Sequence, residues 1–94
     1  MAEHWHVARP FFLCVRPDED VPDDWSWFLY YSLVKTNLEE LGPMDVCQNG
    51  TEATKAVAIA KGHQALSAAE EKFGRDVLAG MRVVFALYAE VSNG

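Results

Sequence analysis

The pattern of apolar positions predicts two β-strands within the first 34 residues. The segment Val7 to Arg16 is rich in β-branched and aromatic residues, and Pro10, which has no backbone donor, is expected at its start or on a sheet edge. Trp25 to Val34 follows a period of two, which divides its side chains between two faces. One face takes Trp25, Trp27, Leu29, Tyr31 and Leu33, and the other takes Ser26, Phe28, Tyr30, Ser32 and Val34.

The second of these segments also fits a helix. Its apolar positions recur at spacings of four and three in Trp27, Tyr31, Val34, Leu38 and Leu41. We favour the strand because aromatic side chains are concentrated here. A capping-box spacing in Thr36-Asn37-Leu38-Glu39 predicts a short helical turn from Asn37 to Leu41 under either interpretation. Met44 to Gln48 is expected to form a short strand, followed by a turn at Asn49-Gly50.

A long helix is predicted where the composition changes at Thr51. Residues 52–73 are rich in Ala, Lys, Glu and Gln, which are good helix formers. Thr51 is the expected N-cap, Glu52 suits the positive end of the helix dipole, and Gly74 is the expected stop. The expected buried stripe contains Ala56, Ile59, His63, Leu66, Ala69 and Phe73.

The last segment, Met81 to Val91, alternates and is predicted to form a half-buried strand. One face of that strand would take Val83, Phe85, Leu87, Ala89 and Val91. A competing helix would place on one stripe, at spacings of four and three, Val77, Met81, Val84, Tyr88 and Val91. The β-branched pair Val83-Val84 and the nearby Gly80 weaken this helix.

These elements predict one α+β domain over residues 1–94. A small antiparallel sheet of three to four strands would pack against one main helix. An all-α bundle is the alternative, because two segments fit both periods. Half of the residues are apolar and 12% are aromatic, which suffices for one compact core and argues against disorder.

Negative charge is concentrated in the first half of the chain. The net charge is -6, and residues 1–50 contain nine acids and three bases, whereas residues 51–94 contain five of each. The densest acidic run, in a loop interrupted by prolines, is Asp18, Glu19, Asp20, Asp23 and Asp24. An acidic patch repels phosphate backbones, so we expect no direct nucleic-acid binding and a protein partner with a basic surface.

The two cysteines, Cys14 and Cys47, form no Cys-x-x-Cys pair. We expect two small buried thiols in a reducing compartment, and a single disulfide is the alternative. Met1 to Val7 has no basic segment followed by an apolar stretch, so we expect no signal peptide. No apolar run approaches the length of a membrane span. The expected location is cytoplasmic, without membrane association.

No residue pattern predicts catalysis or a cofactor. His4 and His6 would point to the same side of a strand, but two ligands do not make a metal site, and His63 would join them only through the fold. The acidic loop lacks the Asp-x-Asp-x-Asp-Gly spacing of an EF-hand. Neither a Gly-x-Ser-x-Gly nucleophile elbow nor a glycine-rich phosphate loop is present. We therefore expect a non-enzymatic protein without a metal or cofactor.

The best functional signal is the aromatic run that follows the acidic loop. Alternating faces cannot all be buried against one helix, so part of this run is expected to remain exposed. Trp and Tyr beside a charged rim are typical of an interface hot spot. The expected partner-binding residues are Asp18, Glu19, Asp20, Asp23, Asp24, Trp25, Trp27, Phe28 and Tyr30.

In size, acidity and layout the chain resembles small phage-encoded inhibitors of the anti-CRISPR type. The resemblance rests on a Trp25-Ser26-Trp27 strand followed by a helix that opens with Thr51-Glu52-Ala53-Thr54, and it assigns no individual residue. It implies an inhibitor that occupies a basic nucleic-acid-binding surface of its target. The alternative is a homodimeric or subunit-type interaction protein, such as an immunity or phage assembly protein.

Overall fold

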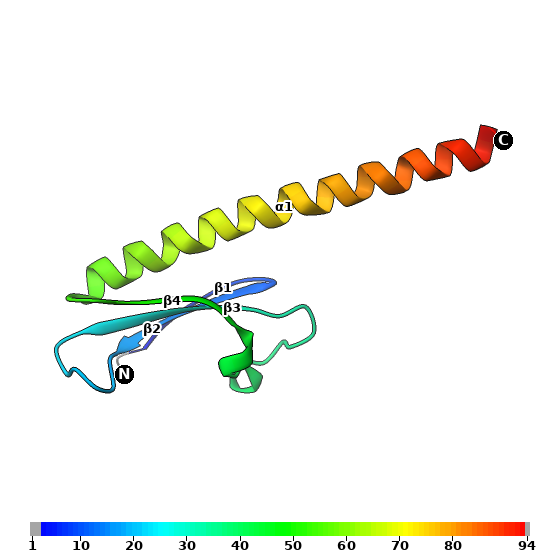
Figure 1. Ribbon diagram of the computed structural model, residues 1–94. Helices are drawn as coiled ribbons and strands as arrows, with labels where there is room; N and C mark the ends of the chain where they lie inside the picture. The colour runs from blue at the N-terminus through cyan, green and yellow to red at the C-terminus, as the bar shows by residue number, and fades with distance from the viewer. Residues whose placement is uncertain (1–2, 94) are drawn as a thin grey trace.

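The computed structural model describes residues 3–93, with side chains described through Met81. A four-stranded antiparallel sheet carries one long helix across one of its faces (Figure 1). The elements are β1 (His4–Ala8), β2 (Phe11–Pro17), β3 (Trp25–Tyr31), β4 (Val46–Glu52) and α1 (Lys55–Asn93). The strands lie side by side in chain order. The α+β prediction is confirmed, and the all-α alternative is wrong.

Each face of the sheet carries its own apolar cluster. Between the sheet and α1, the buried residues are Phe11, Leu13, Val15, Trp27, Leu29, Ala58 and Leu66. On the opposite face they are Phe12, Cys14 and Tyr30. The two sets alternate along β2 and β3, so the predicted period of two is confirmed for β3. Beyond that strand Leu33 and Val34 are exposed.

The segment between β3 and β4 partly covers the face opposite α1. It contains two short 3-10 helices, η1 (Leu38–Glu40) and η2 (Pro43–Asp45), which lie below the sheet in Figure 1. Asn37 accepts a hydrogen bond from the Glu39 backbone N–H at 3.1 Å, which confirms the predicted helical turn. The Lys35 ammonium donates to the Asp45 carboxylate at 2.7 Å, and this bond holds the Asp45 pKa below its usual range.

The first predicted strand, 7–16, is in fact a hairpin. β1 and β2 pair in antiparallel register from His4 opposite Val15 to Ala8 opposite Phe11. The turn falls at Arg9-Pro10, inside the predicted strand. Pro10 cannot donate to a sheet ladder, so the chain reverses direction there. β1 is only five residues long, and its last two residues, Val7 and Ala8, were assigned to the predicted strand.

The predicted turn at Asn49-Gly50 is wrong, because both residues lie inside β4, where they pair with Phe28 and Trp27. Gly50 is needed for a close approach, since a Cβ there would lie 2.6 Å from Trp27 Nε1. Thr51 also belongs to β4 and does not cap α1. The helix begins after Thr54, whose Oγ1 accepts a hydrogen bond from the Val57 backbone N–H at 3.2 Å.

α1 continues without a break through Gly74 to Asn93. The predicted stop at Gly74 and the predicted strand from Met81 to Val91 are therefore wrong. A glycine inside a helix costs only about 1 kcal/mol relative to alanine, which is too little to end a helix with good helix formers on both sides. Among the described residues, no helix combines the length and apolar character needed to cross a membrane.

α1 consists of two parts with different surroundings. Residues 55–73, here called the packed half, lie over the sheet, and residues 74–93, the projecting half, extend past its edge (Figure 1). The molecule measures 65 × 24 × 17 Å along its principal axes. Its long dimension is due to the projecting half.

Candidate functional site

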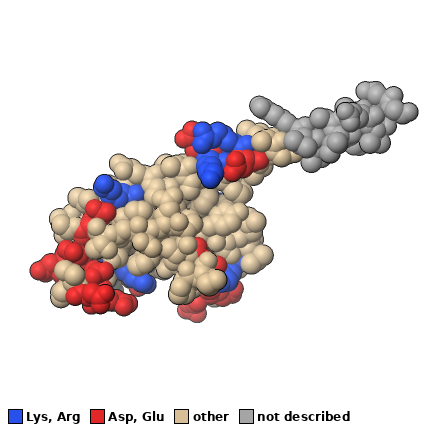
Figure 2. All heavy atoms as spheres, viewed as in Figure 1, with Lys and Arg blue, Asp and Glu red and all other residues tan. Residues whose placement is uncertain are grey.

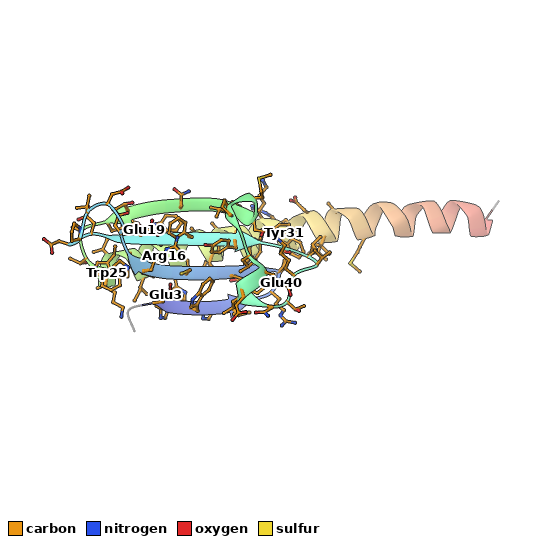
Figure 3. All side chains as sticks on the ribbon, turned by 90° about the horizontal axis from the view of Figure 1, so that it is seen from below. Glu3, Arg16, Glu19, Trp25, Tyr31 and Glu40 are labelled. Atoms are coloured by element: carbon orange, nitrogen blue, oxygen red, sulfur yellow. The ribbon has the colours of Figure 1, made fainter. Side chains whose placement is uncertain are left out.

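The acidic loop, residues 18–24, lies at the tip of the β2–β3 hairpin. Its side chains form a negatively charged patch at one end of the sheet (Figure 2). Glu19, Asp20 and Asp23 are exposed, and Asp24 is half-buried. Glu19 lies at the end of the molecule opposite the projecting half (Figure 3). The patch and the projecting half are therefore far apart.

Asp18 has a structural role within this loop. Its carboxylate accepts hydrogen bonds from the Ser26 hydroxyl and the Val21 backbone N–H, each at 2.8 Å, and from the Asp20 backbone N–H at 3.2 Å. The Ser26 bond, supported by the backbone bonds, holds the pKa of Asp18 below its usual range. Asp18 therefore shapes the loop, and the other four acids are the ones available to a partner.

The two tryptophans of the expected site lie on the side of the sheet covered by α1. Trp27 is buried in the core, and its indole N–H donates to the Glu52 carboxylate at 3.3 Å. Trp25 is half-buried, and the Lys55 ammonium lies 5.3 Å from the centre of a Trp25 ring. Trp27 thus serves the core, and Trp25 lies where the packed half begins.

Phe28 and Tyr30 point to the opposite face. Tyr30 is only 7% exposed and stacks on Trp5 with ring centroids 5.9 Å apart. Phe28 is half-buried, and the Arg16 guanidinium carbon lies 4.4 Å from its ring centroid. A hollow of about 190 Å³ connects Phe28 and Arg16 with the acidic loop. Of the four aromatic residues in the expected site, only Phe28 lies beside the loop on the face opposite α1.

The projecting half presents apolar side chains that no part of the described chain covers. Phe73 is the last residue of α1 that packs on the domain, with its ring 6.0 Å from Phe11 and 6.1 Å from Tyr31. Beyond it Val77, Leu78 and Met81 are 44%, 55% and 47% exposed. Monomeric proteins rarely leave contiguous apolar patches uncovered, so this surface is a candidate for association.

Beyond Met81 the same apolar spacing continues in the sequence. Val77, Met81, Val84, Tyr88 and Val91 follow alternating spacings of four and three. This is the spacing of the a and d positions in a coiled coil. These five residues are the stripe of the competing helix, and because a strand was preferred over residues 81–91 the surface was left out of the expected site.

A groove of about 420 Å³ lies where the projecting half leaves the sheet. Phe11, Tyr31 and Phe73 supply apolar walls, and Lys72 and Asp76 contribute charges. Val77 lies one helical turn beyond Phe73 on the same side of α1. The groove therefore continues the apolar stripe onto the domain.

The fold also brings the three histidines together. The ring of His63, on α1, lies 4.9 Å from that of His6 and 5.9 Å from that of His4, between ring centroids. Across residues 3–81, however, no three His, Cys, Asp or Glu side chains are placed to hold a metal ion. The rings form a contact between β1 and α1.

Both cysteines are free, so the alternative of a disulfide is wrong. Cys14 is buried as expected, and burial raises the pKa of its thiol to about 11. Cys47 is exposed on β4, contrary to the expectation of burial. Neither thiol is activated as a nucleophile, because desolvation raises the pKa of Cys47 as well.

Comparison with known proteins identifies neither a family nor a function for this chain. No family model matches the chain, and neither a curated protein nor a solved structure is significantly similar to it. Function must therefore be inferred from the surfaces described above. Two are available for association: the stripe and groove of the projecting half, and the acidic loop.

Proposed function

We propose that this protein is a non-enzymatic interaction domain that pairs with a second copy of itself through the projecting half of α1. The observation that supports pairing is the exposed apolar stripe on a helix that extends past its own domain. Helices gain most of their stability in proteins from packing an apolar face. The projecting half has such a face and nothing in the described chain against it, so a partner helix would supply the missing contacts.

Charge favours a second copy as that partner. The projecting half has two bases, Arg75 and Arg82, and two acids, Asp76 and Glu90, so its net charge is zero. The excess negative charge lies in the first half of the chain, and the acidic loop is at the far end of the molecule (Figure 3). Two copies joined by their projecting halves would keep their acidic patches apart, and electrostatic repulsion would be small.

The proposed interface combines the stripe with the groove at its base. A stable interface buries roughly 1,200–2,000 Å² in total. The stripe spans only two heptads, which is short for a coiled coil. The groove beside Phe73 adds apolar surface at the base of the projecting half. We therefore expect micromolar affinity and a dimer that depends on both surfaces.

Sedimentation equilibrium across the micromolar range tests this function. The full chain should have twice the monomer mass, and the double variant Val77→Glu/Met81→Glu should have the monomer mass. The matched control is Val34→Glu/Met44→Glu, because these side chains are 84% and 96% exposed outside α1. The control should remain dimeric. A full chain that stays monomeric at every concentration would overturn the proposal.

A second candidate function is binding of a basic protein partner by the acidic loop. Its support is the cluster of Glu19, Asp20, Asp23 and Asp24 on one end of the sheet (Figure 2). Such a patch attracts a basic surface, including one that otherwise holds nucleic acid, and accelerates encounter. Inhibition of a nucleic-acid-handling complex, as in anti-CRISPR proteins, stays a prediction of this candidate.

The test is a pull-down from native lysate, repeated with the four available acids changed to their amides. Asp18 is left unchanged, because the Ser26 hydrogen bond makes it part of the loop structure. The control is Glu39→Gln/Glu40→Gln, which removes two exposed acids from η1. A partner that is lost only with the loop variant would support this candidate. A partner retained by both variants would exclude the loop as its site.

A further inference from the structure

All three histidines of the chain meet at one place, the contact between β1 and α1. His4 and His6 lie on the same side of β1, since they pair with Val15 and Leu13, whose side chains belong to the core beneath α1. His63 reaches them from α1, with ring centroid distances of 4.9 Å to His6 and 5.9 Å to His4. Residues almost sixty positions apart in the sequence therefore form one cluster of imidazoles.

A glycine brings α1 close enough for this contact. A Cβ at Gly62 would lie 2.7 Å from Leu13 Cδ1, closer than side chains pack, so with any other residue at 62 either Leu13 or α1 would have to shift. The next residue, His63, then extends toward β1, the strand beside β2. The position of α1 on the sheet therefore brings the three histidines together.

The cluster is partly open to water, since His6 is exposed and His4 and His63 are half-buried, and within residues 3–81 no carboxylate forms an ion pair with any of the three. The charged groups that act on His63 are His6 and His4 themselves. From β2 the neighbours in register are Leu13 and Val15, which are apolar. His4 Nε2 is buried and has no hydrogen-bond partner among the described residues. Glu3, the acid beside His4, is hydrogen-bonded to the Trp5 indole, and Trp5 belongs to the cluster on the other face.

We propose that this histidine cluster makes the contact between β1 and α1 sensitive to pH, closed while the imidazoles are neutral and opened when they take up protons. A proton on His63 places a positive charge beside the rings of His6 and His4, with no carboxylate at ion-pair distance among the described residues. Separation of edge strand β1 from α1 would expose His63 to water and relieve this effect.

The direction of the pH effect follows from the shift of His63. Desolvation, followed by the proximity of His6 and His4, lowers the pKa of His63 below its ordinary value of 6.5. The unfolded chain therefore binds a proton more readily than the folded chain does. Stability is full above the ordinary value and is lost as the pH falls from there through the lowered folded-state pKa.

The test uses the full chain between about pH 7.5 and about pH 5.5, the range in which histidine is the side chain that ordinarily titrates. Hydrogen bonds hold the pKa values of Asp18 and Asp45 below their usual range, so these acids stay charged there. EDTA is present throughout to exclude metal ions. The urea midpoint and the NMR signals of the imidazoles and β1 amides are followed. We expect the midpoint to fall with pH, and the β1 amides to change before those of β3.

Two variants identify the cause. His63→Gln should reduce the fall of the urea midpoint. His4→Gln/His6→Gln, which leaves His63 with neutral neighbours, should move the His63 titration toward its ordinary pKa and also reduce the fall. A midpoint that is constant in the unmodified chain, or that falls equally in all three proteins, would overturn the proposal. If His63→Gln does not fold, a comparison of the double variant with the unmodified chain still tests whether the histidine cluster causes the fall of the urea midpoint.

This inference does not depend on the proposed pairing. The cluster lies in the packed half, and Val77 and Met81 lie in the projecting half. The same pH series in the Val77→Glu/Met81→Glu background therefore measures the histidine contact in a monomer. A pH effect without pairing, or pairing without a pH effect, would separate the two proposals.

Discussion

The packed and projecting halves of α1 share one helical backbone but are stabilised differently. In the packed half, Ala58 and Leu66 are buried, and Gly62 rests on Leu13. In the projecting half, Val77 and Leu78 are about half exposed. Packing against the sheet stabilises the first half, whereas the described residues of the second half are supported by helical hydrogen bonds and helix-forming residues alone.

The difference is also visible in the choice of residues. The packed half combines small residues at its closest approach to the sheet, Ala58 and Gly62, with larger ones that fill the core, Leu66 and Phe73. The stripe of the projecting half begins with Val77 and Met81 and contains no such small residue.

The largest expected effect is that of removing a buried leucine. Leu66→Ala should lower the free energy of unfolding by about 2 to 5 kcal/mol, because it leaves a cavity between α1 and the sheet. Leu78→Ala, the same change in the projecting half at a side chain that is 55% exposed, should change it by no more than about 0.5 kcal/mol in the monomer. Urea denaturation in the Val77→Glu/Met81→Glu background gives both values. Equal losses would show that the halves do not differ as described.

A second comparison makes one substitution at two glycines. Gly62→Ala should destabilise the protein by about 1 to 3 kcal/mol, since the new Cβ would collide with the buried Leu13. Gly80→Ala should stabilise α1 by about 0.5 to 1 kcal/mol, because a Cβ there has no atom within 4 Å and alanine is the better helix former. Thermal unfolding of both variants should therefore show shifts of opposite sign. Shifts of the same sign would contradict the placement of α1 on β2.

The smallest effect concerns the start of the packed half. Thr54→Ala removes the side chain that accepts the Val57 N–H and should cost about 1 kcal/mol. Thr51→Ala should cost less, because Thr51 lies exposed in β4 and its hydroxyl makes only a long contact, 3.5 Å, with that of Ser26. A comparison of the urea midpoints of the two variants shows which of the two threonines contributes more to stability. A larger loss for Thr51→Ala would restore the N-cap expected from the sequence.

β3 was predictable because its concentration of aromatic side chains favoured a strand over the helix that spacings of four and three also allowed. The division of β3 between Trp27 on one face and Phe28 on the other followed directly from its period of two. The existence of α1 was equally clear from composition. Its start was misplaced because Thr51 and Thr54 are both plausible caps, and only the length of β4 distinguishes them.

The last segment of the chain could not be assigned from periodicity. Residues 81–91 satisfy a period of two and a spacing of four and three equally well. The outcome depended on whether a neighbouring strand was available, which is a tertiary property. The same holds for the candidate surfaces. The acidic loop was recognisable in the sequence. The burial of Trp27 and Tyr30 and the contact of His63 with His6 depend on tertiary structure and were not.

The projecting half also affects how the protein behaves in solution. A compact chain of this length has a radius of gyration of about 12 Å, whereas this chain has 17.7 Å. A monomer will therefore diffuse slowly and leave a gel-filtration column early, at the volume of a larger globular protein. The elution volume alone would therefore not distinguish an elongated monomer from a dimer. The frictional ratio will remain high in the monomeric Val77→Glu/Met81→Glu variant and will fall only when α1 is shortened.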